Sequence, residues 1–172
     1  MIMRRLISPR AWATATVTAV ALCLAAPARS ETPNDQQALA GLSEVKVAFD
    51  LTSGDPKHLL TQLTVIDETR QSVMSQGAKP DFVLAFRGPA TKLVQTDLSQ
   101  VKAEDRELMS KIAEKVRQLR GSSGVTSLEQ CSVAVRLAGT KPENVLPEIK
   151  VVGNSWISLM AYQAKGYGYI AP

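Results

Sequence analysis

The most constraining feature of this sequence is a short, nearly all-apolar run, residues 81–86, that comes soon after a helical pattern. A run of this length ending before Arg87 is typical of a strand that is buried on both faces. An earlier segment, residues 45–51, alternates and is rich in β-branched side chains, which predicts another strand. Between the two, apolar residues recur at helical spacing from Pro56 until Gly77. The order strand, helix, strand predicts a parallel βαβ unit.

The same alternation continues toward the C-terminus. Further strands are predicted at residues 125–131, 149–152 and 167–170. Helical segments are predicted at residues 102–120, 142–146 and 155–164. Asn154, just before the last helix, is a good N-cap residue. The sequence therefore predicts an α/β protein: a three-layer α/β/α sandwich around a mainly parallel, five-stranded sheet.

Residues 132–137 fit two structures. They predict a short helix that ends at Gly139, but Ser132-Val133-Ala134-Val135 also alternates and would continue the preceding strand. Periodicity does not decide between these structures. The choice matters because the helical structure would place Cys131 against a helix N-terminus, where the dipole and free N–H groups favour a thiolate.

Charge is distributed unevenly along the chain. The sequence has 20 basic and 16 acidic residues, and four of the basic residues lie in the first thirty positions, where no acidic residue occurs: Arg4, Arg5, Arg10 and Arg29. The remainder is formally neutral, since 20 minus 4 leaves 16 basic against 16 acidic residues. A neutral body without a Lys/Arg run lacks the footprint of a nucleic-acid-binding protein. We read the C-terminal tyrosines as packing or interface residues: Tyr162, Tyr167 and Tyr169.

Residues 1–30 have the tripartite layout of a secretory signal peptide. A positive start precedes an apolar, small-residue stretch at 11–26 and two small-residue cleavage patterns. That stretch is shorter than the roughly 20 apolar residues of a membrane span, so we expect no stable span after cleavage. We expect export to a bacterial periplasm by either the general or the twin-arginine route. A flexible lead-in at 31–43 and one domain at 44–172 would follow.

Cysteine and histidine usage limits the chemistry. Cleavage of the signal peptide would remove Cys23 and leave Cys131 alone, without a partner for an internal disulfide. His58 is the only histidine, so the sequence offers no Cys/His cluster for zinc. We expect no metal and no organic cofactor. A lone exported thiol is buried and inert, paired between chains, or reactive.

The candidate site follows from the ends of the predicted strands. Ligands of open parallel sheets bind outside the carboxyl ends of the strands, and that edge would hold Asp50, Arg87, Cys131 and Asn154. We expect Cys131 as the nucleophile, with the other three as ligand-binding residues. Each also has a plain structural interpretation. Cys131 would be a buried cysteine, and Arg87 would hold its own loop. Asp50 would cap a neighbouring turn, and Asn154 would cap a helix.

Ordered motifs over residues 44–170 resemble exported members of the DsrE/DsrF-like family. They include Cys131 before an alanine/valine stretch, and the segments VAFD (47–50), DFVLAFRGP (81–89), LPEI (146–149) and NSWISL (154–159). The resemblance implies a three-layer α/β/α fold with a five-stranded, mainly parallel sheet, and frequent homo-oligomers. It also implies that a cysteine in the position of Cys131 carries sulfur as a persulfide.

The leading hypothesis is therefore an exported, sulfurtransferase-like carrier that binds or relays sulfane sulfur on Cys131. Such exchange needs no cofactor, and its partners would be a sulfur donor or acceptor protein. The alternative is a non-catalytic small-ligand-binding or assembly module in which Cys131 is buried. A third hypothesis is redox sensing through a Cys131–Cys131 disulfide between subunits.

Overall fold

Five strands form one all-parallel sheet in the part of the chain that the structure, a computed structural model, describes: residues 33–99 and 101–172. The strands are β1 (Glu44–Leu51), β2 (Lys79–Phe86), β3 (Val125–Cys131), β4 (Lys150–Val152) and β5 (Gly168–Ile170). Their order across the sheet is β4-β3-β2-β1-β5. The predicted signal peptide lies outside the described residues.

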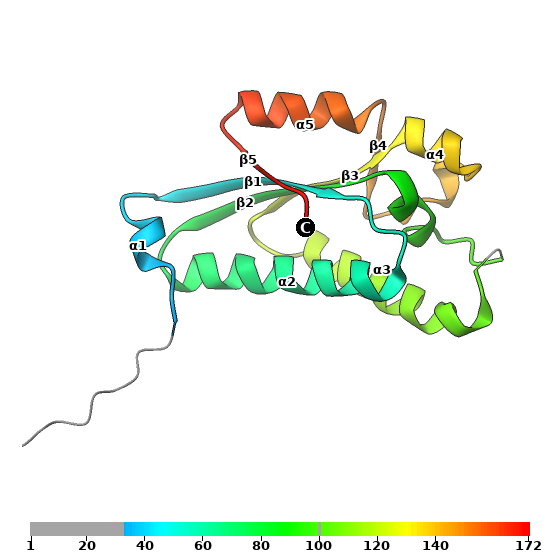
Figure 1. Cartoon of the computed structure of the whole chain (residues 1–172), viewed down its shortest axis with the longest axis horizontal. Coiled ribbons are helices and arrows are strands. Elements are labelled where there is room, and N and C mark those ends of the chain that lie inside the picture. Colours follow the sequence, from blue (N-terminus) through cyan, green and yellow to red (C-terminus); the bar gives the residue numbers. More distant parts are fainter. Residues whose placement is uncertain (1–32, 100) are drawn as a thin grey trace, which may run out of the picture. The chain divides into compact units, whose positions relative to one another are not determined.

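Helices cover both faces of this sheet, so the predicted three-layer α/β/α sandwich is confirmed. The helices α2 (Pro56–Ser75) and α3 (Arg106–Arg120) lie on one face, and α5 (Ser155–Ala164) lies on the other (Figure 1). The shorter segments are α1 (Gln36–Leu39), α4 (Ser132–Ala138) and the 3-10 turns η1 (Gly88–Leu93), η2 (Ala103–Asp105) and η3 (Pro142–Asn144). Within the described residues, no helix is long and apolar enough to cross a membrane.

The segment after Cys131 is a helix, which settles the choice that periodicity left open. Cys131 is the last residue of β3, where it pairs with Val152 of β4. α4 follows at once and ends at Gly139, whose positive φ of 68° suits a residue without a Cβ. The chain thus turns from strand to helix at Cys131.

Several boundaries differ from the sequence prediction: for example, β2 begins at Lys79 instead of residue 81, and the helical turn predicted at 142–146 is the 3-10 turn η3, which ends at Asn144. The helix predicted from residue 102 begins as the 3-10 turn η2, closed by a 3.0 Å hydrogen bond from Asp105 N–H to the Lys102 carbonyl, and α3 starts only at Arg106. In the lead-in, α1 forms one helical turn that the pattern does not predict. Next to α1, the N–H of Asp35 donates to Gln76 Oε1 at 2.8 Å, so this segment is attached to the end of α2.

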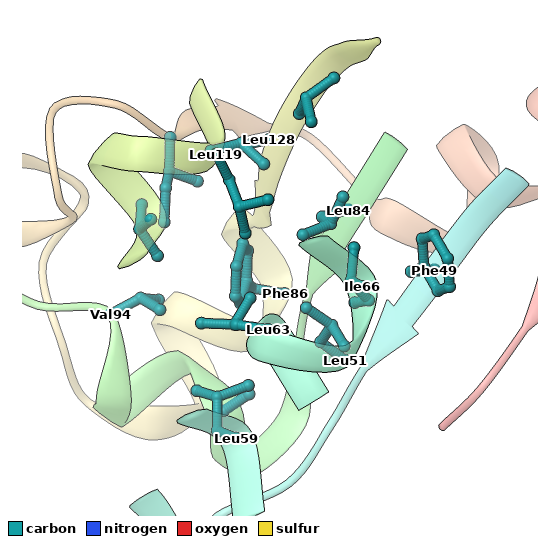
Figure 2. Packing of buried hydrophobic residues seen from close by; sticks show 14 of the residues in the cluster. Phe49, Leu51, Leu59, Leu63, Ile66, Leu84, Phe86, Val94, Leu119 and Leu128 are labelled. Atoms are coloured by element: carbon teal, nitrogen blue, oxygen red, sulfur yellow. The ribbon is translucent and has the colours of Figure 1, made fainter. Parts of the chain in front are cut away.

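The main core lies between the sheet and the helices α2 and α3. Strand alternation sends Phe82, Leu84 and Phe86 of β2 to this side, where all three are fully buried. Figure 2 shows α2 residues such as Leu63 and Ile66 packed over these strands. The opposite face is smaller and has a core of Ala48, Ala85 and Leu159, flanked by Tyr162 and Tyr167.

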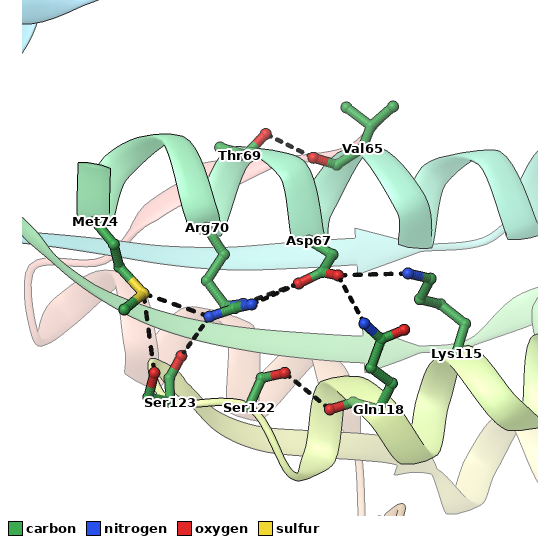
Figure 3. A network of polar contacts seen from close by, with 9 residues as sticks. All are labelled: Val65, Asp67, Thr69, Arg70, Met74, Lys115, Gln118, Ser122 and Ser123. Atoms are coloured by element: carbon green, nitrogen blue, oxygen red, sulfur yellow. Dashed lines mark hydrogen bonds and ion pairs between the residues drawn. The ribbon is translucent and has the colours of Figure 1, made fainter. Parts of the chain in front are cut away.

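A buried ion-pair network joins α2 to α3 (Figure 3). The carboxylate of Asp67 accepts hydrogen bonds from Arg70 Nη2 at 2.8 Å and from Gln118 at 3.3 Å, and it pairs with Lys115 at 3.4 Å. Arg70 also donates to the carbonyl of Ser123 at 3.1 Å. Burial raises the pKa of Asp67, but the Arg70 guanidinium and the other donors outweigh it, so the pKa of Asp67 lies below its ordinary value.

Candidate functional site

A cavity of about 510 Å³ opens at the carboxyl edge of the sheet. Its lining comes from three chain segments that each follow a strand: η1 after β2, α4 after β3, and the start of α5 after β4. Three of the four predicted site residues line it, namely Arg87, Cys131 and Asn154. The ends of β2, β3 and β4 therefore bring these residues to one place, as expected for an open parallel sheet.

Cys131 lies between the N-termini of two helices. It is the N-cap residue of α4, and its Sγ accepts a hydrogen bond from the backbone N–H of Ser155, the first residue of α5, at 3.4 Å. Only 5% of Cys131 is exposed, yet the residue lines the cavity. The thiol is thus buried from bulk water while it borders a space that a small molecule can enter.

These surroundings favour the thiolate form of Cys131. Burial raises the pKa of the thiol, but the nearby Ser155 hydroxyl and the N–H groups of Ser155, Ala134 and Val133 lower it, so the pKa of Cys131 lies below its ordinary value. Ser155 is fully buried, and its Oγ has no well-formed hydrogen bond to any described residue. This hydroxyl is therefore available to donate when Cys131 ionises.

Arg87 is held by Asp50 and not by its own loop. Arg87 donates from Nε to Asp50 Oδ1 at 2.7 Å and from Nη2 to Asp50 Oδ2 at 2.5 Å, a two-point ion pair between the ends of β2 and β1. The hydrogen bonds to Asp50 raise the pKa of Arg87 against the effect of burial. Asp50 is 2% exposed and does not line the cavity. It neutralises Arg87, and nothing in its position supports direct ligand contact.

Asn154 caps α5, as the sequence predicted, and its predicted role in ligand binding stays a prediction. Its Oδ1 accepts a hydrogen bond from Trp156 N–H at 3.0 Å and so caps α5, and the residue also lines the cavity. Two further residues at the site were missed by sequence reasoning: Ser155 and Lys92. Ser155 had a signal, since it follows a predicted N-cap. Lys92 had none, because the 3-10 turn that carries it to the cavity is not visible as a sequence pattern.

The three C-terminal tyrosines link α5 and the residues that follow it to β1, β2 and β3. Each hydroxyl donates to a carboxylate on a different strand: Tyr169 to Asp50 (2.5 Å), Tyr167 to Asp81 (2.6 Å) and Tyr162 to Glu129 (2.9 Å). Burial and the bond to Glu129 raise the pKa of Tyr162 to about 12. Phenol–carboxylate contacts therefore connect the C-terminal segment to the strands on the α5 side of the sheet. They lie beside the smaller of the two cores.

Among the described residues, no group of three or more His, Cys, Asp or Glu side chains is placed to hold a metal ion. What the site offers is a thiol with a lowered pKa, helix N–H groups, one paired arginine and one lysine. This set of groups suits nucleophilic and exchange chemistry of sulfur.

The sheet and its cavity define an α/β protein with an open parallel sheet. No protein-family model matches the chain. It is 27% identical over 128 residues to an uncharacterized protein of Aquifex aeolicus, a match that covers 74% of this chain and 56% of that protein, so the chain spans little more than half the length of this relative. A solved structure of a protein of unknown function from Methanobacterium thermoautotrophicum is similar with a TM-score of 0.57 and 19% identity, over 74% of this chain and 99% of the other. The latter likeness shows the fold alone.

Proposed function

We propose that this protein binds and relays sulfane sulfur as a persulfide on Cys131. One observation carries the proposal: the Cys131 Sγ, which accepts a hydrogen bond from Ser155 N–H at the start of α5, also borders a cavity large enough for a small molecule. A thiolate at such a position is nucleophilic near neutral pH. The resemblance of the sequence to DsrE/DsrF-like proteins agrees with this role.

The reaction is a thiol–persulfide exchange. The Cys131 thiolate attacks the outer sulfur of a donor R–S–SH, a Cys131 Sγ–S bond forms, and the donor S–S bond breaks. The donor leaves as the thiolate R–S⁻, and the proton stays on the transferred sulfur. No net oxidation occurs, because one S–S bond replaces another. A second thiolate removes the sulfur by the same step in reverse.

In the same proposal the protein works in a bacterial periplasm, after cleavage of residues 1–30, as a homo-oligomer that meets a donor or acceptor protein. The signal-peptide pattern supports export, and the family resemblance supports oligomers.

Sulfur loading tests the proposal. The experiment uses the full chain with Cys23→Ser, in which Cys131 is the only cysteine. This protein is incubated with inorganic polysulfide, and its mass is then measured by mass spectrometry. We expect the mass to rise by one sulfur atom and to return to its starting value after cyanide or excess thiol. A second variant that also carries Cys131→Ser should stay folded by circular dichroism and gain no sulfur. Equal loading of the two variants would refute the proposal.

The alternative is a small-ligand-binding module with an inert cysteine. The observation that favours it is the low exposure of Cys131, 5%, beneath a cavity with largely apolar walls. In that case Cys131 would react with a thiol reagent only after denaturation. An intersubunit Cys131–Cys131 disulfide is disfavoured by the same burial, because two Cα atoms must come within roughly 7 Å.

A further inference from the structure

The cavity contains one basic side chain whose charge is not already compensated. Of its two basic lining residues, Arg87 is paired with Asp50. Lys92 is exposed and forms no ion pair with any residue in 33–99 or 101–172. Lys92 also borders a smaller hollow that Asp105 lines, but no ion pair joins the two. The cavity thus has a local positive charge at Lys92.

The rest of the lining is mostly apolar. It includes Pro89 from η1, Val133, Ala134 and Leu137 from α4, and Trp156 from α5. Leu137 is 75% exposed and Trp156 is 64% exposed, and because both line the cavity they leave apolar surface there for a ligand to cover. The volume of about 510 Å³ lies in the range of small-molecule sites, roughly 300–1,000 Å³. An inorganic polysulfide of a few atoms would leave most of it unfilled.

We propose that the molecule that exchanges sulfur with Cys131 is a small organic persulfide with an apolar body and one carboxylate. This inference rests on the proposed function. The apolar body covers Leu137 and Trp156, the carboxylate pairs with Lys92, and the outer sulfur meets Cys131. After transfer, the donor is left as a thiolate, which then departs from the cavity. Charge complementarity selects an anion, because Arg87 is already neutralised and Lys92 is not.

The first test compares two disulfide probes on the Cys23→Ser chain. Dithionitrobenzoate carries a carboxylate on each ring, whereas dithiodipyridine is uncharged. Lys92→Met should lower the ratio of the rate with dithionitrobenzoate to the rate with dithiodipyridine about two- to five-fold, the effect expected for one exposed charge pair. The matched control is Lys102→Met, since Lys102 is exposed, pairs with Glu104 and does not line the cavity. Equal rate ratios in all three proteins would overturn the inference.

The second test needs no reactive cysteine. The sequence has two tryptophans, so in the full chain with Trp12→Phe and Cys131→Ser the fluorescence comes from Trp156 alone, which lines the cavity. We expect octanoate to change this fluorescence saturably, and Lys92→Met to weaken its binding about two- to five-fold while octanamide binding is unaffected. No saturable change, or equal octanoate binding in the variant, would overturn the inference.

The two proposals fail in different ways. Loading of Cys131 by polysulfide without octanoate binding would overturn the organic donor and keep the sulfur relay. Octanoate binding without any sulfur loading of Cys131 would overturn the relay, and with it the identity of the donor.

Discussion

The backbone N–H of Ser155 donates to the Sγ of Cys131 at 3.4 Å and joins the first residue of α5 to the last residue of β3. Residues 24 apart in sequence meet here because β3 and β4 are parallel neighbours, so that the turns after both strands lie at the same edge. The contact gives the thiol a hydrogen-bond donor of a kind that a cysteine buried in an apolar core lacks. It is the basis of the proposed chemistry.

Asp50 should act on the cavity only through Arg87. Asp50→Asn removes the negative charge of the two-point pair, so we expect the free energy of unfolding to fall by about 1–3 kcal/mol in urea denaturation. Because Arg87 is then uncompensated, the preference of Cys131 for dithionitrobenzoate over dithiodipyridine should rise, opposite to the effect of Lys92→Met. An unchanged or lower preference would contradict the assigned role.

Asp67 should be one of the most important charged residues for stability. Asp67→Ala leaves Arg70 buried without its counter-charge, so we expect a loss of about 3–5 kcal/mol in urea denaturation. Glu107→Ala, which removes an exposed pair with Lys111 on α3, is the control and should change little. A small effect at Asp67 would mean that packing alone joins α2 to α3.

The same carboxylate predicts a loss of stability in acid. The pKa of Asp67 in the folded state lies below its ordinary 3.8, so its contribution is complete above that value and is lost as the pH falls through the lower, folded-state pKa. Denaturation curves recorded across this range should show a smaller pH dependence for Asp67→Asn than for the unmodified chain. Identical pH dependence would contradict the lowered pKa.

The tyrosines should ionise abnormally late. All three tyrosines of the sequence donate to carboxylates, and the pKa of Tyr162 is raised to about 12. In an ultraviolet titration of the folded protein, we expect no phenolate near pH 10, the ordinary value, whereas the unfolded chain titrates there. A raised pKa stabilises the fold fully below the unfolded value and less as the pH rises toward about 12. A normal phenolate titration of the folded protein would contradict these contacts.

The arrangement of strands and helices was predictable from the sequence because its signals are local. The apolar run in β2, the Asp55-Pro56 start of α2 and Gly77 after its end each have a direct physical meaning. In the structure Asp55 caps α2 by accepting a hydrogen bond from His58 N–H at 2.9 Å. Strand ends then located Arg87, Cys131 and Asn154 at one edge, since parallel strands end together.

The other features depend on which distant residues meet, and local patterns do not encode that. The Asp50–Arg87 pair and the tyrosine–carboxylate contacts arise from the sheet order β4-β3-β2-β1-β5, in which β5 returns beside β1. Lys92 reaches the cavity through a 3-10 turn without a repeating pattern. The sequence therefore predicted the place of the site, but not its balance of charge.

The pH dependence of Cys131 alkylation tests the central claim most directly. The rate with iodoacetamide is measured for the native Cys23→Ser chain from about pH 4 to pH 10, across the ordinary thiol pKa of roughly 8.5. We predict an apparent pKa below that value, and a higher one in Ser155→Ala, which removes the hydroxyl donor but keeps the N–H. An ordinary or raised pKa, the same pKa in both proteins, or no reaction before unfolding would contradict the account.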